Sequence, residues 1–261
     1  MSESRNIPTE RPPGIALFDL DGTLIAWDCQ LLFRHFVVRH EPWRVIFVAI
    51  FLVLVPLAKW IGIEGMKRVF LAYLWGVDRE TRQQYASDFA DAVMPAIYPE
   101  VKAMLDEHRR KGEFSVLTSA SPEFYVKEIG KRLGFDLVLG TEVEFGPVFP
   151  DLENHKGAAK VIRLRNLLPA SWFDDSGSLK AHGYTDSTAD LPLLEVCDRA
   201  TVVNPGERLA MLAAENGWDV VRPERPWKSR MGFAWRTVAL LLGVGRDPGG
   251  LGVRPGGPLK D

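Results

Sequence analysis

The sequence predicts an α/β protein, in which helices cover both faces of a parallel sheet and a helical cap is inserted after the first strand. Two observations lead to this fold class. Apolar runs of strand length alternate with amphipathic helical patterns over most of the 261 residues, and residues 28–98 interrupt this alternation with helical patterns alone. Ligands of such sheets gather at the carboxyl ends of the strands, so functional residues are expected there.

Five short apolar runs that end in turn residues are predicted to be strands. The first run leads directly into two aspartates, and the other four come after the predicted cap. DLVLGT is the weakest of the five. The runs are GIALFDL (14–20), EFSVLTSAS (113–121), DLVLGT (136–141), AHGYTDS (181–187) and RATVVNP (199–205).

Three helical patterns lie between the predicted strands, which implies parallel connections. The first two end in glycine after basic residues, as helix C-termini often do. In the second, Ser121 is predicted to be the N-cap and Pro122 the first helical residue. The patterns are YPEVKAMLDEHRRKG (98–112), SPEFYVKEIGKRLG (121–134) and KGAAKVIRLRNLL (156–168).

Composition excludes several other classes of protein. The formal net charge of −2 gives no sign of nucleic-acid binding. Cys29 and Cys197 have neither metal-ligand spacing nor a disulfide framework, which fits free thiols in the reducing cytoplasm. Residues 1–13 lack the features of a signal peptide and are expected to be a flexible lead-in. The Gly/Pro-rich residues 246–261 are expected to be disordered.

Two carboxylates follow the first predicted strand directly. Asp19 and Asp21 are two residues apart, so their side chains point the same way on an extended chain. Gly22 allows a tight turn and a close approach to a ligand, and Thr23 can hydrogen-bond locally or to that ligand. The pattern D-x-D-G-T after an apolar strand is more specific than a simple Asp-Gly turn, and it indicates a functional site.

A second acidic pair follows another predicted strand, in GYTDSTADLPLL. On their own, Asp186 and Asp190 would fit a turn followed by a helix N-cap. Beside Asp19 and Asp21 they would concentrate negative charge that needs a cation, because burial and repulsion would otherwise raise their pKa values. Oxygen ligands with open positions favour Mg²⁺, which keeps water ligands and shares a phosphate.

Hydroxyl and basic side chains complete a candidate phosphate site. Thr118 and Ser119 end the strand FSVLTS before a predicted helix, where hydroxyls and free N–H groups bind anions. Lys156 and Lys160 lie one helical turn apart in NHKGAAKV, and one of them would supply positive charge against the phosphate.

In this order, the motifs resemble those of the haloacid dehalogenase superfamily of phosphohydrolases, in its subfamily IB. DLDGT resembles the first motif, LTSAS the second, the lysine segment the third and YTDSTADLPLL the fourth. The resemblance implies a Rossmann-like core formed by residues 14–27 and 99–222, with an all-helical cap over residues 28–98. It also implies a phosphate monoester as substrate, because the second aspartate is present.

The resemblance implies roles for the four aspartates. Asp19 would be the nucleophile that becomes an aspartyl phosphate. Asp21 would be the general acid for the leaving alcohol and then the base for water. Mg²⁺ would be held by Asp19, Asp186 and the main-chain carbonyl of Asp21, and Asp190 would support that site.

The other matching residues would bind the phosphate. Thr118 would contact the phosphoryl oxygens with help from the backbone around Ser119. The G-x-x-K-V form of the third motif favours Lys160 as the catalytic lysine. Phosphoserine phosphatases more often have lysine directly before glycine, which leaves Lys156 as the alternative.

The predicted cap contains an apolar run, VIFVAIFLVLVPLA (45–58), with fourteen uncharged residues. Trp43 and Arg44 precede it, and Lys59 and Trp60 follow. Such flanks are typical of interfacial or membrane-inserted segments, although a span needs about twenty residues. The run fits a re-entrant or in-plane helix, a pair of short helices, or a helix buried within the cap.

A second amphipathic helix is predicted over residues 223–245, where Trp227 and basic residues precede an apolar stretch with Trp235 and Arg236. This order favours binding to an anionic lipid surface, and the alternative is a helix docked on the core.

The cap contains the segment AYLWGVDRETRQQYASDFADAV, and together with its apolar run it resembles the cap of the C-type phosphatidylglycerophosphatases. This resemblance implies a phospholipid phosphate substrate and contact with the cytoplasmic face of a membrane. A soluble metabolite such as phosphoserine is the alternative substrate, because the core motifs are close to that subgroup.

Overall fold

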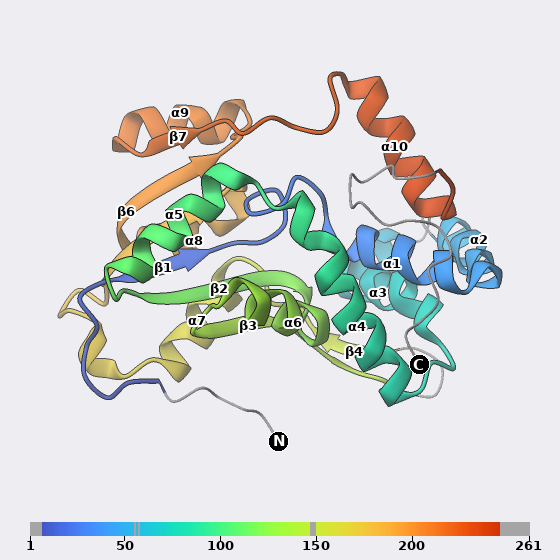
Figure 1. Cartoon of the computed structure of the whole chain (residues 1–261), viewed down its shortest axis with the longest axis horizontal. Coiled ribbons are helices and arrows are strands. Elements are labelled where there is room, and N and C mark those ends of the chain that lie inside the picture. The colour runs from blue at the N-terminus through green and yellow to red at the C-terminus, as the bar shows by residue number, and fades with distance from the viewer. Residues whose placement is uncertain (1–6, 55, 57, 147–149, 246–261) are drawn as a thin grey trace.

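The computed structural model describes residues 7–54, 56, 58–146 and 150–245, and for residues 58, 59, 61 and 63 it describes the backbone alone. Its centre is a seven-stranded sheet of order β4-β3-β2-β1-β5-β6-β7 (Figure 1). Neighbouring strands are parallel except β3 and β4. The strands are β1 (Ile15–Phe18), β2 (Phe114–Pro122), β3 (Leu137–Glu144), β4 (Asp151–Glu153), β5 (Leu179–Thr185), β6 (Cys197–Val203) and β7 (Asp219–Val221).

The predicted fold class is confirmed, and all five predicted strands are present. β4 and β7 were not predicted because each has three residues, too few to form an apolar run of strand length. The predicted disordered tail and the first six residues of the predicted lead-in lie outside the described residues.

Helices cover both faces of the sheet, as predicted (Figure 1). Side chains of β1 alternate between the faces, since Ala16 and Phe18 pack with α5 and α6 whereas Ile15 and Leu17 pack with α7 and α8. These helices therefore enclose β1 as the most buried strand of the core. The helices are α5 (Pro99–Arg110), α6 (Glu123–Leu133), α7 (Ala158–Leu167), α8 (Leu191–Glu195) and α9 (Glu207–Asn216).

The strand order reverses at β1, which places a site at its carboxyl end. From β1 the chain adds β2 and β3 on one side, and it later adds β5, β6 and β7 on the other. Connections that diverge in this way leave a crevice beyond the carboxyl end of the central strand. The two aspartates of DLDGT follow β1 at this point.

The start of α6 differs from the prediction. Strand β2 continues to Pro122, which is the N-cap without a side-chain hydrogen bond, and the helix begins at Glu123. The prediction of Ser121 as N-cap is therefore wrong. The Ser121 hydroxyl instead donates to Asp21 Oδ2 (2.8 Å), so a contact across the sheet edge outweighs local capping.

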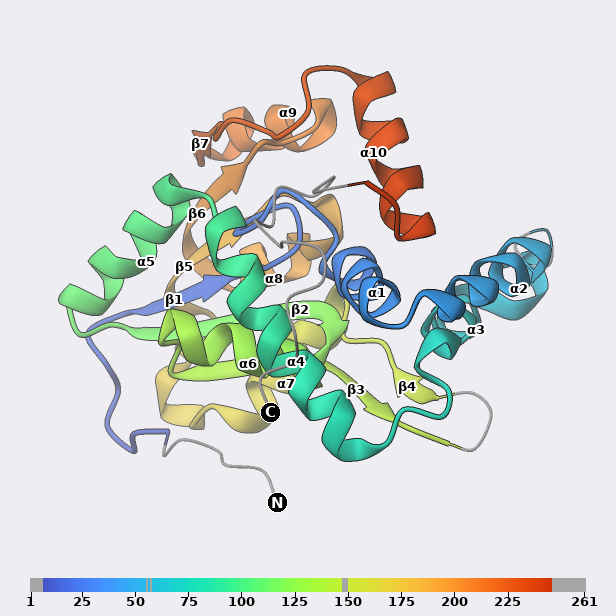
Figure 2. The ribbon, with the colours of Figure 1, turned by 45° about the vertical axis from the view of Figure 1, so that its right-hand side comes forward.

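Between β1 and β2 the described chain forms helices (Figure 2). Helix α1 begins after Asp28, whose carboxylate accepts from the Leu31 N–H (3.1 Å). Helix α3 is broken at Gly62, where φ is +73°. Figure 2 shows α2 and α3 projecting beyond α1, and α4 packs against α6. The elements are α1 (Cys29–His40), η1 (Pro42–Val45), α2 (Ile46–Leu54), α3 (Ala58–Phe70), η3 (Leu71–Leu74), α4 (Arg79–Val93) and η4 (Met94–Ala96).

Within the apolar run of the cap, residues 46–54 form a short, mostly exposed helix, and residues 55 and 57 lie outside the described residues. In α2 only Val48 is buried, whereas Val53 is 73% exposed. The alternative of a helix buried within the cap therefore does not describe α2. None of the described helices combines the length and apolar character needed to cross a membrane.

Helix α10 (Arg230–Leu242) packs on α1, and the Arg34 guanidinium donates to the carbonyl of Leu241. Only Leu240 of α10 is buried, while Met231 and Trp235 are 82% and 75% exposed. Figures 1 and 2 show α10 and α2 at the same end of the molecule. Both helices thus present apolar side chains to solvent there.

Candidate active site

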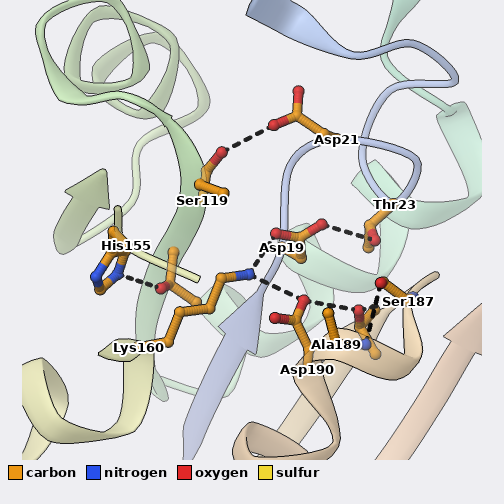
Figure 3. A network of polar contacts seen from close by, with 12 residues as sticks. Asp19, Asp21, Thr23, Ser119, His155, Lys160, Ser187, Ala189 and Asp190 are labelled. Carbon is orange, nitrogen blue, oxygen red and sulfur yellow. Dashed lines mark hydrogen bonds and ion pairs between the residues drawn. The ribbon is translucent and has the colours of Figure 1, made fainter. Parts of the chain in front are cut away.

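The sequence-predicted residues meet at the carboxyl ends of three neighbouring strands. Phe18 of β1 lies beside Leu117 of β2 and Tyr184 of β5, so Asp19 follows between Thr118 and Thr185. Figure 3 shows the resulting network of polar contacts. The residues brought together are Asp19, Asp21, Gly22, Thr23, Thr118, Ser119, Lys160, Asp186 and Asp190.

Lys160 forms a buried double ion pair with two of the carboxylates. Its Nζ donates to Asp19 Oδ1 (2.6 Å) and to Asp190 Oδ2 (2.9 Å), and the lysine is 1% exposed (Figure 3). Although burial opposes it, the two carboxylates raise the pKa of Lys160. Lys156 lines the same cavity but is exposed, so of the two alternatives only Lys160 contacts the predicted nucleophile.

Asp19 carries an unfavourable charge in this setting. Burial raises its pKa well above the usual value, and the charges of Asp190, Asp21 and Asp186 raise it further, whereas Lys160 opposes the shift. The carboxylate is 5% exposed and lies on the wall of the cavity. Such a group is stabilised as an anion by bringing more positive charge close to it.

Asp21 is oriented by three donors. Its Oδ1 accepts from the Cys29 N–H (2.6 Å), and its Oδ2 accepts from the hydroxyls of Ser119 (3.0 Å) and Ser121 (2.8 Å). Ser121 was not predicted as a site residue. Its position two residues after Ser119 on β2 is the same alternation that identified Asp19 and Asp21, so this signal was available.

Asp186 closes the other side of the DLDGT turn. The Thr23 hydroxyl contacts both Asp19 Oδ2 (3.4 Å) and Asp186 Oδ1 (3.5 Å), so these two carboxylates converge. Burial, followed by the charges of Asp21 and Asp190, raises the pKa of Asp186 to about 6. Asp190 is 3% exposed and also accepts from the Thr185 hydroxyl (3.0 Å).

These donors fit Mg²⁺. Two converging carboxylates with raised pKa values form an oxygen-only site that a divalent cation would stabilise, and the main-chain carbonyl of Asp21 would add a third oxygen. Within the described residues, no group of three or more His, Cys, Asp or Glu side chains is arranged to hold a metal ion. The set inferred here contains two side-chain carboxylates, so water and substrate oxygens would complete it.

Gly22 is required by this geometry, because a Cβ there would lie 2.1 Å from Asp186 Oδ2 and φ is +83°. We expect Gly22→Ala to lower kcat/KM at least about 100-fold by displacing Asp186. Gly76→Ala is the matched control, since Gly76 has φ +73° and nothing within 4 Å of an added Cβ. Both variants should lose about 1–2 kcal/mol of stability through backbone strain, measured by urea unfolding. Equal activity in the two variants would contradict the role of Gly22.

Two further side chains of the site were missed. His155 Nε2 lies 2.9 Å from Thr118 Oγ1, and burial, then the charges of Arg163 and Lys160, lower the pKa of His155 to about 3. A neutral imidazole therefore positions the Thr118 hydroxyl at pH 7. His155 directly precedes Lys156 in NHKG, and its position in the sequence does not show that it approaches Thr118.

Lys67 is the second missed residue, and it joins the cap to the core. From α3, its Nζ donates to the carbonyl of Ala120 (2.9 Å) and to Asn154 Oδ1 (2.5 Å). Burial lowers the pKa of Lys67, while the charges of Asp28 and Asp21 oppose that shift. No motif surrounds this lysine, so the sequence offers no signal for it.

One cavity of about 1240 Å³ connects these groups to an apolar wall. Asp19, Asp21 and Asp186 line it together with side chains of α2, α3 and α10. A buried carboxylate, a paired lysine and convergent carboxylates are suited to transfer of an anionic group, with space for a large leaving group. The large apolar side chains of the wall are Trp27, Leu31, Phe51, Met66, Phe70, Trp227 and Phe233.

A family model described as haloacid dehalogenase-like hydrolase matches residues 16–195. The chain is 30% identical over 228 residues to an inhibition of morphological differentiation protein from Streptomyces azureus, covering 82% of this chain and 80% of the relative. It is 25% identical to a histidinol-phosphatase from Neisseria meningitidis, covering 79% and 97%. A solved structure of a phospho-aspartyl intermediate analogue of phosphoserine phosphatase shares the fold with a TM-score of 0.53 and 15% identity, covering 81% of this chain and 94% of that one.

Proposed function

The chain belongs to the haloacid dehalogenase-like hydrolase family and is a phosphatase of that family, and we propose that it hydrolyses phosphate monoesters of membrane lipids, such as phosphatidylglycerophosphate. The single observation that carries this proposal is the cavity, which places Asp19 and Lys160 in one space with an apolar wall. A phosphate monoester with an apolar body would fill both parts of that space.

In the proposed reaction Asp19 attacks the phosphorus atom and the bond to the leaving alcohol breaks, while Asp21 gives its proton to that alcohol. Asp21 then takes a proton from a water molecule, whose oxygen attacks the phosphorus. The bond between the phosphorus and Asp19 breaks, which releases inorganic phosphate and restores the Asp19 carboxylate. Lys160 and the Thr118 hydroxyl, with the backbone around Ser119, bind the phosphoryl oxygens as charge spreads over them. When bound at Asp19, Asp186 and the Asp21 carbonyl, Mg²⁺ supplies charge compensation.

Exposed apolar side chains near the cavity support a lipid substrate. In α2, Phe51 lines the cavity while Leu52 and Val53 are 57% and 73% exposed. In α10, Phe233 lines the cavity while Trp235 is 75% exposed. Helices that contribute to a substrate cavity and also present apolar surface would bind the bilayer interface in-plane, at the cytoplasmic face of the membrane.

The second candidate is a soluble phosphate monoester, such as phosphoserine. Similarity to a histidinol-phosphatase favours it, because that name denotes a phosphatase of a small polar substrate. The polar cap residue Lys67 also faces the cavity. The two candidates share the chemistry at Asp19 and differ in what the apolar wall contacts.

Phosphate release from two substrates in parallel tests the proposal. One is phosphatidylglycerophosphate in mixed micelles of an uncharged detergent, and the other is phosphoserine in buffer. We expect kcat/KM to be at least about 100-fold higher for the lipid, because apolar burial contributes only to the lipid complex. Chelation with EDTA should abolish release, and Mg²⁺ should restore it. Preference for phosphoserine would reject the lipid proposal and leave the catalytic assignment standing.

A further inference from the structure

The C-terminal segment around α10 forms part of the wall of the active-site cavity. Trp227 and Phe233 contact Trp27, with ring centroids 4.6 and 5.6 Å apart. Trp27 is 2% exposed and follows the catalytic DLDGT turn closely in the chain. The aromatic cluster therefore fixes the C-terminal segment against the catalytic turn. This segment lies beyond residues 16–195, which the family model matches.

Among the described residues, six basic side chains line the cavity, and three of them have evident partners or roles. Lys160 pairs with Asp19 and Asp190, and Lys67 donates to Ala120 and Asn154, as described above. Lys156 belongs to the segment that matches the third motif. The other three are exposed, come from the C-terminal segment and form no salt bridge with a described carboxylate. They are Arg225, Lys228 and Arg230.

The reacting phosphate does not account for these three cations. Its charge is met at the strand ends by Lys160 and by the proposed cation, and its oxygens by Thr118. Arg225 donates to the Asn204 carbonyl (2.9 Å), which holds its guanidinium beside the cavity. Trp27 and Thr237, which line the same cavity, have an indole N–H and a hydroxyl without a partner in the described structure. Acceptor oxygens on the substrate would supply partners for such donors.

The geometry points to a second anion-binding subsite, formed by Arg225, Lys228 and Arg230 beside the Trp27–Trp227–Phe233 cluster. This subsite binds a phosphodiester that is part of the leaving group of the substrate and does not itself react. This inference rests on the proposed function and narrows its substrate class. Lipids with a phosphodiester between the acyl chains and the terminal phosphate are substrates, and phosphatidate, whose one phosphate is the reacting group, is disfavoured.

The test compares phosphatidylglycerophosphate with phosphatidate of the same acyl chains, each in uncharged detergent micelles. The triple variant Arg225→Gln, Lys228→Gln, Arg230→Gln should lower the ratio of the two kcat/KM values at least about tenfold, because charge-assisted bonds to the diester are lost. The matched control is Lys180→Gln, Arg208→Gln, Arg222→Gln, which removes the same charge from exposed positions outside the cavity. It should leave the ratio within about threefold, since distant surface charges are screened.

An unchanged ratio in the first triple variant would overturn the inference. If the unchanged ratio came from an equal fall in kcat/KM on both lipids, the three cations would act only through general attraction to anionic micelles. Deacylated substrates distinguish a failure of the subsite inference from a failure of the proposed lipid substrate. If neither lipid is hydrolysed, glycerophosphoglycerophosphate and glycerol 3-phosphate form the corresponding soluble pair. If the triple variant lowers the ratio of kcat/KM for this soluble pair about tenfold or more, as expected for lost charge-assisted bonds, the subsite is supported. The lipid substrate is then rejected.

Discussion

Asp19→Asn is expected to abolish phosphate release, lowering kcat by at least about 1,000-fold, since removing a covalent nucleophile leaves only the residual effect of the binding groups. The amide fits the space of the carboxylate, and Lys160 keeps its ion pair with Asp190 (2.9 Å). Burial already raises the pKa of Asp19, so loss of its charge removes an unfavourable term for the folded state. The variant should therefore unfold in urea at a concentration similar to that of the parent protein.

The control for this variant is Asp175→Asn, an exposed carboxyl in a turn outside the cavity. It should keep the activity of the parent. A second readout follows ³²P transfer from the substrate to the protein, which should label the parent transiently and Asp19→Asn not at all. Activity of Asp19→Asn within a few-fold of the parent would reject the nucleophile assignment.

Lys160→Met should lose both activity and stability. Methionine leaves Asp19 and Asp190, which are 5% and 3% exposed, without their shared cation. Breaking a buried ion pair by removing one partner costs about 3–5 kcal/mol, and the loss of positive charge at the phosphoryl group should lower kcat at least about 100-fold. Urea unfolding at pH 7 and phosphate release would measure the two effects.

Lys156→Met is the matched control, since Lys156 is exposed on the wall of the same cavity. It should change stability by less than about 0.5 kcal/mol. The double variant Lys160→Met, Asp190→Asn should recover part of the lost stability, because one buried carboxyl is removed with its partner. If Lys156→Met abolishes turnover and Lys160→Met does not, the assignment of the two lysines is reversed.

The sequence identified the part of the site that short-range spacing determines. Asp19 and Asp21 lie two residues apart after a strand, so local geometry alone places them together, and Gly22 follows from the turn. The G-x-x-K-V form favoured Lys160 over Lys156, but spacing alone could not decide between the two lysines, because both precede or begin one helix. The ion pair of Lys160 with Asp19 depends on the position of α7 against β1, which no local pattern encodes.

The residues that were missed depend on contacts between distant segments. Ser121 fits a helix N-cap within SPEF, and only the approach of Asp21 from β1 shows that its hydroxyl belongs to the site. Lys67 is one basic residue among many, and its importance comes from the packing of α3 beside Ala120 and Asn154. The strands β4 and β7 were missed for a different reason, because three residues are too few to form an apolar run, and pairing with β3 and β6 stabilises them.

The central position of β1 has a consequence for the order in which the protein folds. Ile15 pairs with Phe114 on one side and with Ala181 on the other, which are 99 and 166 residues later in the chain. During synthesis β1, the most buried strand, therefore leaves the ribosome before both of its neighbours and stays unpaired until they have been made. Pairings this far apart fold slowly and expose apolar strand edges to other nascent chains, so the ribosome-bound protein should need chaperone protection until β5 has been made.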